Sequence, residues 1–471
     1  MNFNSVIFIG FLGLTVLINY LLPLKFRSVF LLSCSLLFIS YYNIESLTAL
    51  LVISCFNFYI ARKVAGNRLL YIAGIAINSY AIMMFNYFFA VKQGIGFSYS
   101  QVHFNINSFI IALGLSFYSL QNISYLTEIY FKRLKPENSV KNFLLYNSFF
   151  PRIASGPVML PNEFIPQIDR NEISREMLVS GFNRVLQGLF KKMVIADRIA
   201  PAVHSVFDFG DTYHGLTTIA AIYLFTLQLY FDFSGYSDIA LGAGRMLGYN
   251  LKENFNFPLR SISISEFWRR WHISLISWFT NYIYYPFVYT LRRYKKAAAF
   301  GGIAITFFIS GIWHGIGLTF LLWAACHIFY LGIELLTRPF REKHFHKPGS
   351  QVFKILMIFI VFNAVCFSNI FFRSESTGRA FELIRNAGSN LLPNDWLAEF
   401  LAPLAIGGHQ ADEFNFYISI LLMLVFLIFE RSITNRALSS MASIGYISIL
   451  LLLIFIFGVF NSGEQFIYMQ F

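Results

Sequence analysis

The stretch AAAFGGIAITFFISGIWHGIGLTFLLWAACHIFYLGIELL, residues 297–336, sets the fold class of this chain because it is apolar and nearly uncharged. A bilayer-crossing helix needs about 20 mainly apolar residues, so the stretch can hold two crossings, at 298–313 and 316–336. Trp313-His314-Gly315 lies where the two runs meet. Burying an imidazole in hydrocarbon is costly unless it has polar partners or faces water. The stretch therefore predicts a membrane protein with an informative polar residue inside it.

The composition of the whole chain supports the same class. The 471 residues include 36 Lys and Arg against 24 Asp and Glu, a net charge of +12, and only 13% are charged. Soluble domains carry about 25% charged residues, so this chain has too little polar surface for a water-facing globule. Its 56 Phe and 26 Tyr argue against disorder, which requires few aromatic residues. These values disfavour a soluble enzyme, a disordered scaffold and a secreted disulfide protein.

The cysteines and the excess of basic residues point to no metal, redox or nucleic-acid site. Cys34, Cys55, Cys326 and Cys366 lie in apolar stretches without CxxC pairing, so we expect small buried side chains. The lysines and arginines stand in short loops between apolar runs, whereas nucleic-acid binding needs a water-exposed basic face. We therefore expect contact with membrane lipid and no nucleic-acid partner.

The apolar runs predict an all-α polytopic bundle of about 11–12 transmembrane helices. The candidate runs are 5–23, 28–43, 46–61, 69–90, 107–127, 143–160, 214–234, 298–313, 316–336, 355–372, 414–430 and 440–460. The run 143–160 contains two prolines and is expected to be broken or re-entrant, with its loose backbone buried in protein. Residues 178–200 and 262–290 mix apolar faces with charges, so we expect amphipathic helices there, at an interface or lining a cavity.

Basic residues gather in alternate loops, and this asymmetry predicts an orientation. The basic loops contain Lys25/Arg27, Arg62/Lys63/Arg68, Lys132/Arg133/Lys135/Lys141, Arg292/Arg293/Lys295/Lys296, Arg338 to Lys347 and Arg431/Arg436. Loops 43–46 and 91–106 are poor in Lys and Arg, and 373–412 has more acidic than basic residues. The positive-inside rule then predicts that both termini lie outside, with about twelve crossings. The first run lacks a basic n-region and a cleavage site, so we expect a retained span.

The sequence YFDFSGYSD, Tyr230–Asp238, places two carboxylates at the end of an apolar run. Asp232 and Asp238 are not a general acid–base pair by their spacing alone. They could cap a broken helix end and satisfy its backbone, or they could line a polar cavity. The sequence leaves both interpretations open.

A second polar cluster, SEFWRRWHIS, covers Ser265–Ser274. Its aromatic and basic side chains suit the headgroup level of a membrane, where amphipathic rings and cations settle. These side chains are Trp268, Arg269, Arg270 and Trp271, followed by Trp278. Interfacial anchoring does not explain His272, which we expect on the helix among apolar neighbours, either as a core residue or as a functional one.

The third cluster, SGIWHGIG, surrounds His314 at Ser310–Gly317. Its three glycines remove side chains beside the imidazole, which permits either close helix packing or the approach of a substrate. A neutral imidazole in a low-polarity cavity is a suitable general base for an alcohol, so His314 is a catalytic candidate. His327 is expected to face another direction and to be structural.

Basic residues also cluster in GLFKKMVIADR, Gly188–Arg198. Lys191, Lys192 and Arg198 could bind lipid phosphates or attract a phosphorylated cytoplasmic donor such as coenzyme A. The sequence contains no Gly-rich phosphate loop, HExxH or GxSxG element, so a nucleotidase, a zincin or a serine hydrolase of the GxSxG type is unsupported.

In this order, the clusters resemble the membrane-bound O-acyltransferase family, in particular its alginate O-acetyltransferase branch. The matching motifs are Phe117-Tyr-Ser-Leu-Gln121 with Ser124-Tyr-Leu126, Phe149-Phe-Pro151 with Ser155-Gly-Pro157, Glu163-Phe-Ile-Pro-Gln167, Gly188–Arg198, Tyr230–Asp238, Phe267–Ser274, Trp313-His-Gly315 and Phe466–Phe471. Each motif alone is weak evidence, but together they cover most of the chain and agree with the predicted spans.

The resemblance implies that His314 is the principal catalytic histidine and His272 a second functional histidine. It implies a helix bundle in the bacterial cytoplasmic (inner) membrane, thinned at its middle, where funnels from the cytoplasm and from outside meet. An acyl group would enter from a cytoplasmic thioester, acetyl-CoA in the first instance, with no bound cofactor or metal. An outward-facing terminal motif would present Tyr468 as an acyl relay. The acyl group would then pass to an extracytoplasmic partner protein that modifies an exopolysaccharide or another envelope polymer.

The other candidate residues would have supporting roles. Those expected to draw the donor phosphates are Lys191, Lys192, Arg269 and Arg270. Those expected to line the cavity are Asp232, Asp238 and Trp313. We expect one integral-membrane acyltransferase domain over 1–471, with N-terminal helices at 1–130, a catalytic core at 131–336 and C-terminal helices at 337–471.

The sequence departs from the family pattern at several positions. Where relatives usually read Trp-Leu-Arg-Asp-Tyr, this chain has Trp278-Phe-Thr-Asn-Tyr282, which removes both charges. Val288-Tyr289 replaces an expected Gly-Gly, and Glu128 stands where Asp is usual. These changes are compatible with a different donor or acceptor, while both histidines are retained.

Two alternatives remain open. A D-alanyl transferase for teichoic-acid-type polymers would take its acyl group from an aminoacylated carrier protein in place of coenzyme A. A polysaccharide or lipid transporter or flippase would also place polar residues inside a bundle, but it would move its substrate without acyl transfer. The lack of an internal repeat in the sequence and the paired histidine clusters favour the enzyme.

Overall fold

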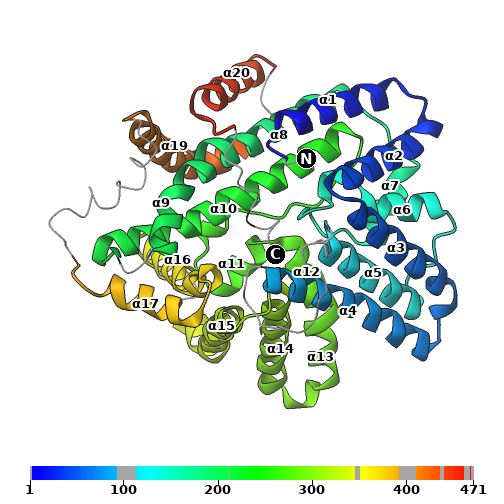
Figure 1. The fold of residues 1–471 in the computed structure, drawn as a ribbon. Helices are drawn as coiled ribbons and strands as arrows, with labels where there is room; N and C mark the ends of the chain where they lie inside the picture. The colour runs from blue at the N-terminus through cyan, green and yellow to red at the C-terminus, as the bar shows by residue number, and fades with distance from the viewer. Residues whose placement is uncertain are drawn as a thin grey trace, which may run out of the picture. The chain divides into compact units, whose positions relative to one another are not determined.

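The computed structural model describes residues 3–92, 113–209, 212–344, 351–391, 410–434, 440–460 and 467. Within these ranges every regular element is a helix (Figure 1), which confirms the all-α prediction. Contacts between residues divide the chain into two compact units. Unit 1 comprises Met1–Gly188, Tyr236–Glu253 and Gln465–Phe471, and unit 2 comprises Leu189–Gly235 and Asn254–Glu464. The single-domain organisation expected from the sequence stays a prediction.

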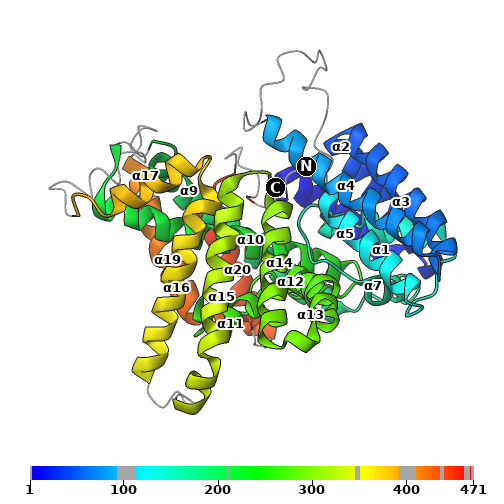
Figure 2. The same ribbon diagram turned by 90° about the horizontal axis from the view of Figure 1, so that it is seen from below.

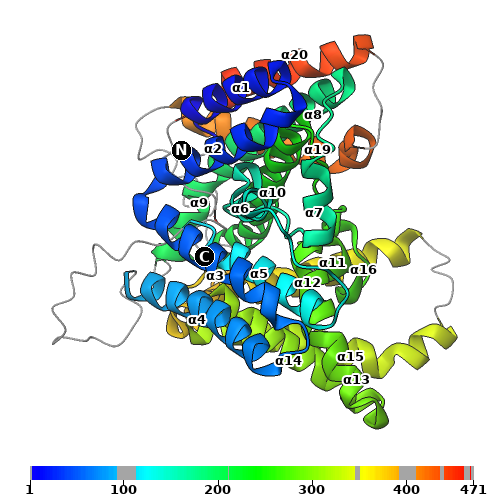
Figure 3. The ribbon, with the colours of Figure 1, turned by 90° about the vertical axis from the view of Figure 1, so that its right-hand side faces the viewer.

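Unit 1 begins with consecutive helices that pack on one another (Figure 3). They are α1 (Val6–Leu21), α2 (Leu24–Tyr42), α3 (Ile44–Val64), α4 (Arg68–Lys92) and α5 (Leu115–Tyr130). Polar side chains cap the starts of two helices. At α1 the Phe8 N–H donates to Ser5 Oγ at 3.1 Å, and at α3 the Asn43 side chain accepts from the Ser46 N–H. Two buried amides, Asn57 and Asn78, hydrogen-bond each other at 3.1 and 2.8 Å and so join α3 to α4.

Shorter helices complete the first part of unit 1, namely α6 (Val140–Ser148), α7 (Pro161–Ile168) and α8 (Arg175–Leu189). A single 3-10 turn, Phe150–Arg152, and irregular chain follow α6, so the run 143–160 is broken as expected. Pro151 contributes to the break because it lacks a backbone N–H. The 9 residues of α6 rise about 14 Å, which is too short to cross a bilayer.

Long helices form the centre of unit 2, where α15 (Leu318–His344) packs against both α14 (Lys296–His314) and α16 (Gln351–Arg373) (Figure 2). The other α-helices of this unit are α9 (Asp197–Asp208), α11 (Ile264–Arg270), α12 (Ile273–Phe279), α13 (Tyr285–Thr290), α17 (Thr377–Ala387), α19 (Gln410–Thr434) and α20 (Ser440–Phe457). Two π-helical turns, η3 (Phe190–Ala196) and η6 (Thr280–Tyr284), interrupt the regular ladder, and such turns are frequent at functional sites.

The longest described helix, α10 (Gly215–Met246), belongs to unit 2 up to Gly235 and to unit 1 from Tyr236. It continues through the Ser-Gly pair that follows its apolar run. The interpretation of Asp232 and Asp238 as caps of a broken helix end is therefore wrong, since both lie inside one helix. A single glycine inside a helix costs only about 1 kcal/mol, which the burial of this segment outweighs.

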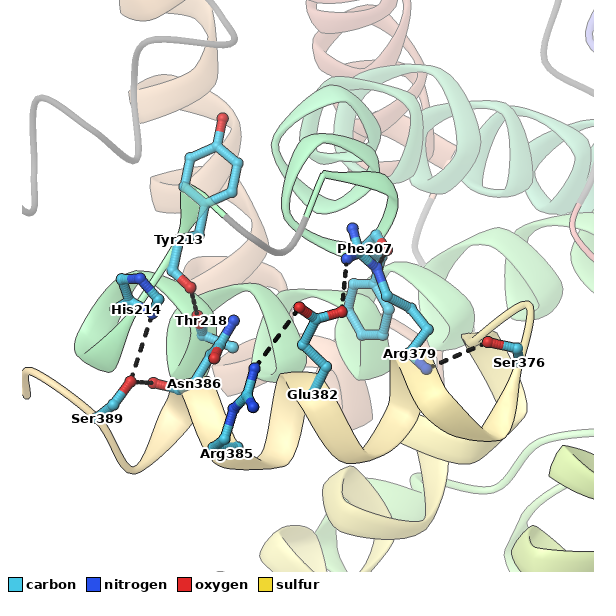
Figure 4. A network of polar contacts seen from close by, with 10 residues as sticks. All are labelled: Phe207, Tyr213, His214, Thr218, Ser376, Arg379, Glu382, Arg385, Asn386 and Ser389. Atoms are coloured by element: carbon cyan, nitrogen blue, oxygen red, sulfur yellow. Dashed lines mark hydrogen bonds and ion pairs between the residues drawn. The ribbon is translucent and has the colours of Figure 1, made fainter.

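A polar network fixes α17, which lies at the start of the long polar connection that follows α16 (Figure 4). Ser376 caps α17 by accepting from the Arg379 N–H at 3.2 Å, and Arg379 Nε donates to the Phe207 carbonyl oxygen at 3.0 Å. Glu382 pairs with Arg379 at 2.9 Å and with Arg385 at 3.8 Å. The connection is thereby attached to α9, which contains Phe207.

The end of α20 is attached to the π-helical turn η3. The Val459 N–H donates to the Met193 carbonyl oxygen at 3.1 Å, and Arg198 Nε donates to the Phe457 carbonyl oxygen at 2.9 Å. A π-turn displaces the i to i+4 ladder, so a carbonyl within it can accept from another segment. Both contacts are made by backbone groups of the C-terminal segment.

Seven described helices are long and apolar enough to cross a membrane, namely α2, α3, α10, α14, α15, α16 and α19. Three shorter apolar helices lie at Val6–Leu21, Arg68–Met84 and Ile444–Phe457. The described residues supply fewer spans than the about 11–12 expected, because α6 is short and α5 is lined with buried polar side chains. A polytopic membrane bundle is confirmed, and the opposed funnels stay a prediction.

Candidate active site

His314 closes helix α14 and lies in an aromatic enclosure. Its buried imidazole packs edge-on against Trp313, Trp323 and Phe372, with ring centroids 4.8, 5.2 and 5.2 Å away. These three rings belong to α14, α15 and α16, so three helices restrict the orientation of the imidazole. The structure thus places His314 at a helix end where its ring is held by packing.

Glycines allow α15 to approach the end of α14. A Cβ atom on Gly311 would lie 3.0 Å from the Phe320 carbonyl oxygen, and one on Gly315 would lie 2.3 Å from the Phe320 ring. The space at Gly317 is larger, because a Cβ atom there would first meet Thr319 at 3.5 Å. Close helix packing, one of the two interpretations drawn from the sequence, accounts for Gly311 and Gly315.

His272 occupies a break between α11 and α12, with φ 46° and ψ 49°. The prediction that it lies on a continuous helix over 262–290 is wrong, because the chain leaves α11 after Arg270 and enters α12 at Ile273. A left-handed backbone at a non-glycine residue costs about 1–3 kcal/mol and is typical of functional sites. The imidazole is buried and meets the Phe233 ring edge-on at 4.7 Å.

Asn254 stabilises this break, and sequence reasoning missed it. Its backbone carbonyl oxygen accepts from the Ile273 N–H at 3.0 Å. Its side-chain Oδ1 accepts from the Ser274 N–H at 3.2 Å and from Ser274 Oγ at 2.6 Å. The only signal in the sequence is an asparagine inside the aromatic-rich Asn254-Phe-Asn-Phe257, which resembles an ordinary turn.

The charge state of His272 follows from its surroundings. Burial holds the pKa of His272 well below its usual range, and the neighbouring His314 lowers it further. His272 is therefore neutral at pH 7, so it can accept a hydrogen bond at one ring nitrogen and donate from the other.

His327 has a partner at each ring nitrogen. Trp268 Nε1 lies 3.2 Å from His327 Nδ1, and Ser368 Oγ lies 3.1 Å from His327 Nε2. An indole N–H can only donate, so Nδ1 is the acceptor and Nε2 carries the proton of the neutral ring. Ser368 Oγ uses its own proton on the Val365 carbonyl oxygen, at 2.9 Å, and accepts from Nε2. These contacts give His327 the structural role expected of it.

A model of the "MBOAT, membrane-bound O-acyltransferase family" matches residues 31–372, a range that contains both histidines of the candidate site. The chain belongs to this family. It is an integral membrane O-acyltransferase.

Three curated relatives align with more than half of this acyltransferase. A probable alginate O-acetylase AlgI of Azotobacter vinelandii is 31% identical over 81% of this chain and 77% of its own length. A peptidoglycan O-acetyltransferase of Helicobacter pylori is 31% identical over 81% of this chain and 79% of its own length. A teichoic acid D-alanyltransferase of Bacillus subtilis is 27% identical over 59% of this chain and 72% of its own length.

The acyltransferase buries the lysines of η3 in an ionic network. Lys192 Nζ lies 2.8 Å from Asp197 Oδ1 and 2.7 Å from Asp232 Oδ1, and Lys191 Nζ lies 3.8 Å from Glu430 Oε1. Burial by itself would lower the pKa of Lys192, but the two carboxylates raise it above its usual value. Lys192 is therefore charged and already paired, and a role for either lysine in donor binding stays a prediction.

The other predicted site residues lie apart from this network. Asp238 accepts from Arg184 Nε at 2.5 Å within unit 1. Arg270 pairs with Glu266 at 2.6 Å, whereas Arg269 is exposed. Tyr468 lies outside the described residues. Within the described ranges, no three His, Cys, Asp or Glu side chains are grouped to hold a metal ion.

Substitution of His327 tests its structural role in the acyltransferase. The amide of His327→Gln can accept from Trp268 and donate to Ser368, whereas His327→Leu can do neither. We expect the Leu variant to lower the melting temperature and to lose up to about 100-fold in acyl-transfer rate, because small displacements in an active site are costly. The Gln variant should stay near wild type in both measurements. Equal and complete loss of acyl transfer in both variants would indicate instead that the imidazole itself reacts.

Substitution of Lys192 tests whether the network is structural. Lys192→Met would leave Asp197 and Asp232 as buried carboxylates without their cation, a change that costs about 3–5 kcal/mol. We expect a lower melting temperature and less monodisperse protein in detergent. The exposed Lys25→Met is the control and should match wild type. A Lys192→Met protein with wild-type melting but a raised KM for the acyl donor would favour donor binding instead.

Proposed function

We propose that this acyltransferase takes an acetyl group from a cytoplasmic thioester, acetyl-CoA, and delivers it outside for O-acetylation of a cell-envelope polymer. The observation that carries the proposal is the pair of buried histidines, His272 and His314, both in unit 2. Two relatives that are 31% identical to this chain are named for alginate and peptidoglycan O-acetylation, which supports the acetyl group.

His314 is the general base of the proposed reaction. Its imidazole takes the proton of an attacking hydroxyl while the hydroxyl oxygen bonds to the thioester carbonyl carbon. The carbonyl electron pair moves to oxygen, returns as the carbon–sulfur bond breaks, and the imidazolium gives its proton to the leaving thiolate. The aromatic enclosure suits this role, because an apolar setting favours the neutral imidazole that the reaction requires.

His272 stabilises the reacting carbonyl or positions the donor. As a neutral ring it offers one N–H that can hydrogen-bond the oxygen on which negative charge develops. The left-handed backbone at His272 sets the direction in which its side chain leaves the chain. Exposed Arg269 is a candidate contact for the donor phosphates, since guanidinium groups bind phosphate through several N–H donors.

The coverage of the relatives favours acetyl over D-alanyl transfer. The D-alanyltransferase of Bacillus subtilis is less identical and aligns with 59% of this chain, against 81% for the two O-acetylation relatives. The final acceptor in the proposal is a polymer modified by an extracytoplasmic partner protein. We propose the cytoplasmic (inner) membrane as its location, with outward termini that the loop charges support, and Tyr468 as the first acyl acceptor.

His314→Ala should abolish acetyl transfer while the protein still inserts in the membrane. The substitution removes the general base and leaves the helix ends unchanged, so we expect the rate to fall by about 100-fold or more. The measurement is release of thiol from acetyl-CoA by purified protein together with its acceptor. His214→Ala, the same substitution at a half-buried histidine, is the control. Normal transfer by His314→Ala would refute the assignment.

Tyr468→Phe tests the acyl relay. The variant keeps the aromatic ring and removes the hydroxyl that would accept the acetyl group. Intact-protein mass spectrometry after incubation with labelled acetyl-CoA should show one labelled acetyl group on wild type and none on the variant. Label retained equally by both proteins would remove Tyr468 as the relay without affecting the role of His314.

A further inference from the structure

Asn254 holds an oriented amide beside His272. The side chain is 0% exposed, and the backbone carbonyl oxygen binds the Ile273 N–H, which belongs to the peptide unit that leaves His272. Side-chain Oδ1 takes two hydrogen bonds from Ser274, at 3.2 and 2.6 Å. Asn254 is thus attached to both residues that follow the candidate histidine.

The contacts with Ser274 fix which way the amide points. A backbone N–H can only donate, so the atom facing Ser274 must be the oxygen, and Nδ2 lies on the opposite side of the amide. Nδ2 is buried, and none of the described residues accepts a hydrogen bond from it. A buried donor without a partner costs about 1–3 kcal/mol, so such a group calls for a functional explanation.

We propose that Nδ2 of Asn254 donates a hydrogen bond to the carbonyl oxygen of the transferred acyl group. The inference rests on the proposed acetyl transfer. As the hydroxyl attacks, the carbon–oxygen π electron pair moves onto this oxygen, and the amide N–H stabilises the developing negative charge. The pair returns to the carbonyl when the carbon–sulfur bond breaks. Asn254 neither gains nor loses a proton, and it adds a second donor to the one that His272 can supply.

The placement of Asn254 suits this role. Its Oδ1 is locked by two hydrogen bonds, so Nδ2 needs no reorganisation when charge develops. The amide is neutral at every working pH, so its donor ability does not depend on protonation. Asn254 also binds the backbone that follows His272, so the amide and the imidazole keep a fixed relative position.

A purely structural role is the competing explanation, and two variants separate it from catalysis. Asn254→Asp keeps an oxygen toward Ser274 and replaces the Nδ2 group with a second oxygen. Ser274→Ala removes one of the two hydrogen bonds to Oδ1 and leaves Nδ2 in place. If Asn254 acts only through its hydrogen bonds to Ser274, Ser274→Ala lowers kcat for acetyl transfer. If Asn254 acts through Nδ2, Asn254→Asp lowers kcat.

The experiment measures kcat and KM for acetyl-CoA with full-length protein in detergent. We expect Asn254→Asp to lower kcat by about 100- to 1,000-fold with KM within about twofold of wild type, and Ser274→Ala to stay within about fivefold. Wild-type kcat in Asn254→Asp would overturn the inference, as would equal losses in both variants. A wild-type protein that transfers no acetyl group would instead refute the proposed function.

A spectroscopic measurement distinguishes loss of the hydrogen bond from a folding defect in Asn254→Asp. Acetonyl-CoA carries a ketone in place of the thioester and cannot be cleaved, so its carbonyl stretching frequency reports hydrogen bonding in the bound state. We expect a lower frequency on wild type than in water, and a return toward the higher frequency on Asn254→Ala, which introduces no charge. An unchanged frequency on Asn254→Ala would overturn the inference.

Discussion

Burying a polar group inside an apolar helix bundle costs free energy unless it has a partner, and pairs of buried polar groups recur through the described structure. Asn57 and Asn78 satisfy each other across two helices, and Lys192 satisfies two carboxylates from different segments. His327 does the same between Trp268 and Ser368. Lipid tails give no hydrophobic force between helices, so a few paired polar groups determine which helices meet and in what register.

The same constraint explains how the candidate site can be buried and still polar. Neutral groups such as imidazoles and amides cost far less to bury than ions, so His272 and Asn254 can be held without counter-charges. A buried site built from neutral donors also keeps its hydrogen bonds strong, because the local dielectric is low. Among the described residues, buried charges such as Lys192 and Asp238 are held in ion pairs.

Local signals in the sequence predicted the helical fold, the break after α6 and the catalytic candidate His314, because each depends on neighbours along the chain. The backbone at His272 could not be predicted in this way, since Asn254, which holds it, is distant in sequence and resembles a turn residue. The ion pair of Lys192 could not be predicted for a related reason, because its partner Asp232 lies in another helix and only the fold brings the two together.

The contact between α20 and η3 bears on how the C-terminal segment can evolve. Val459 and Phe457 are held through backbone atoms, by the Met193 carbonyl oxygen and the Arg198 guanidinium. Backbone groups are the same in every residue type except proline at a donor position. The two contacts therefore do not depend on the side chains of Phe457 and Val459, and homologous chains can vary these two residues while the point of attachment persists.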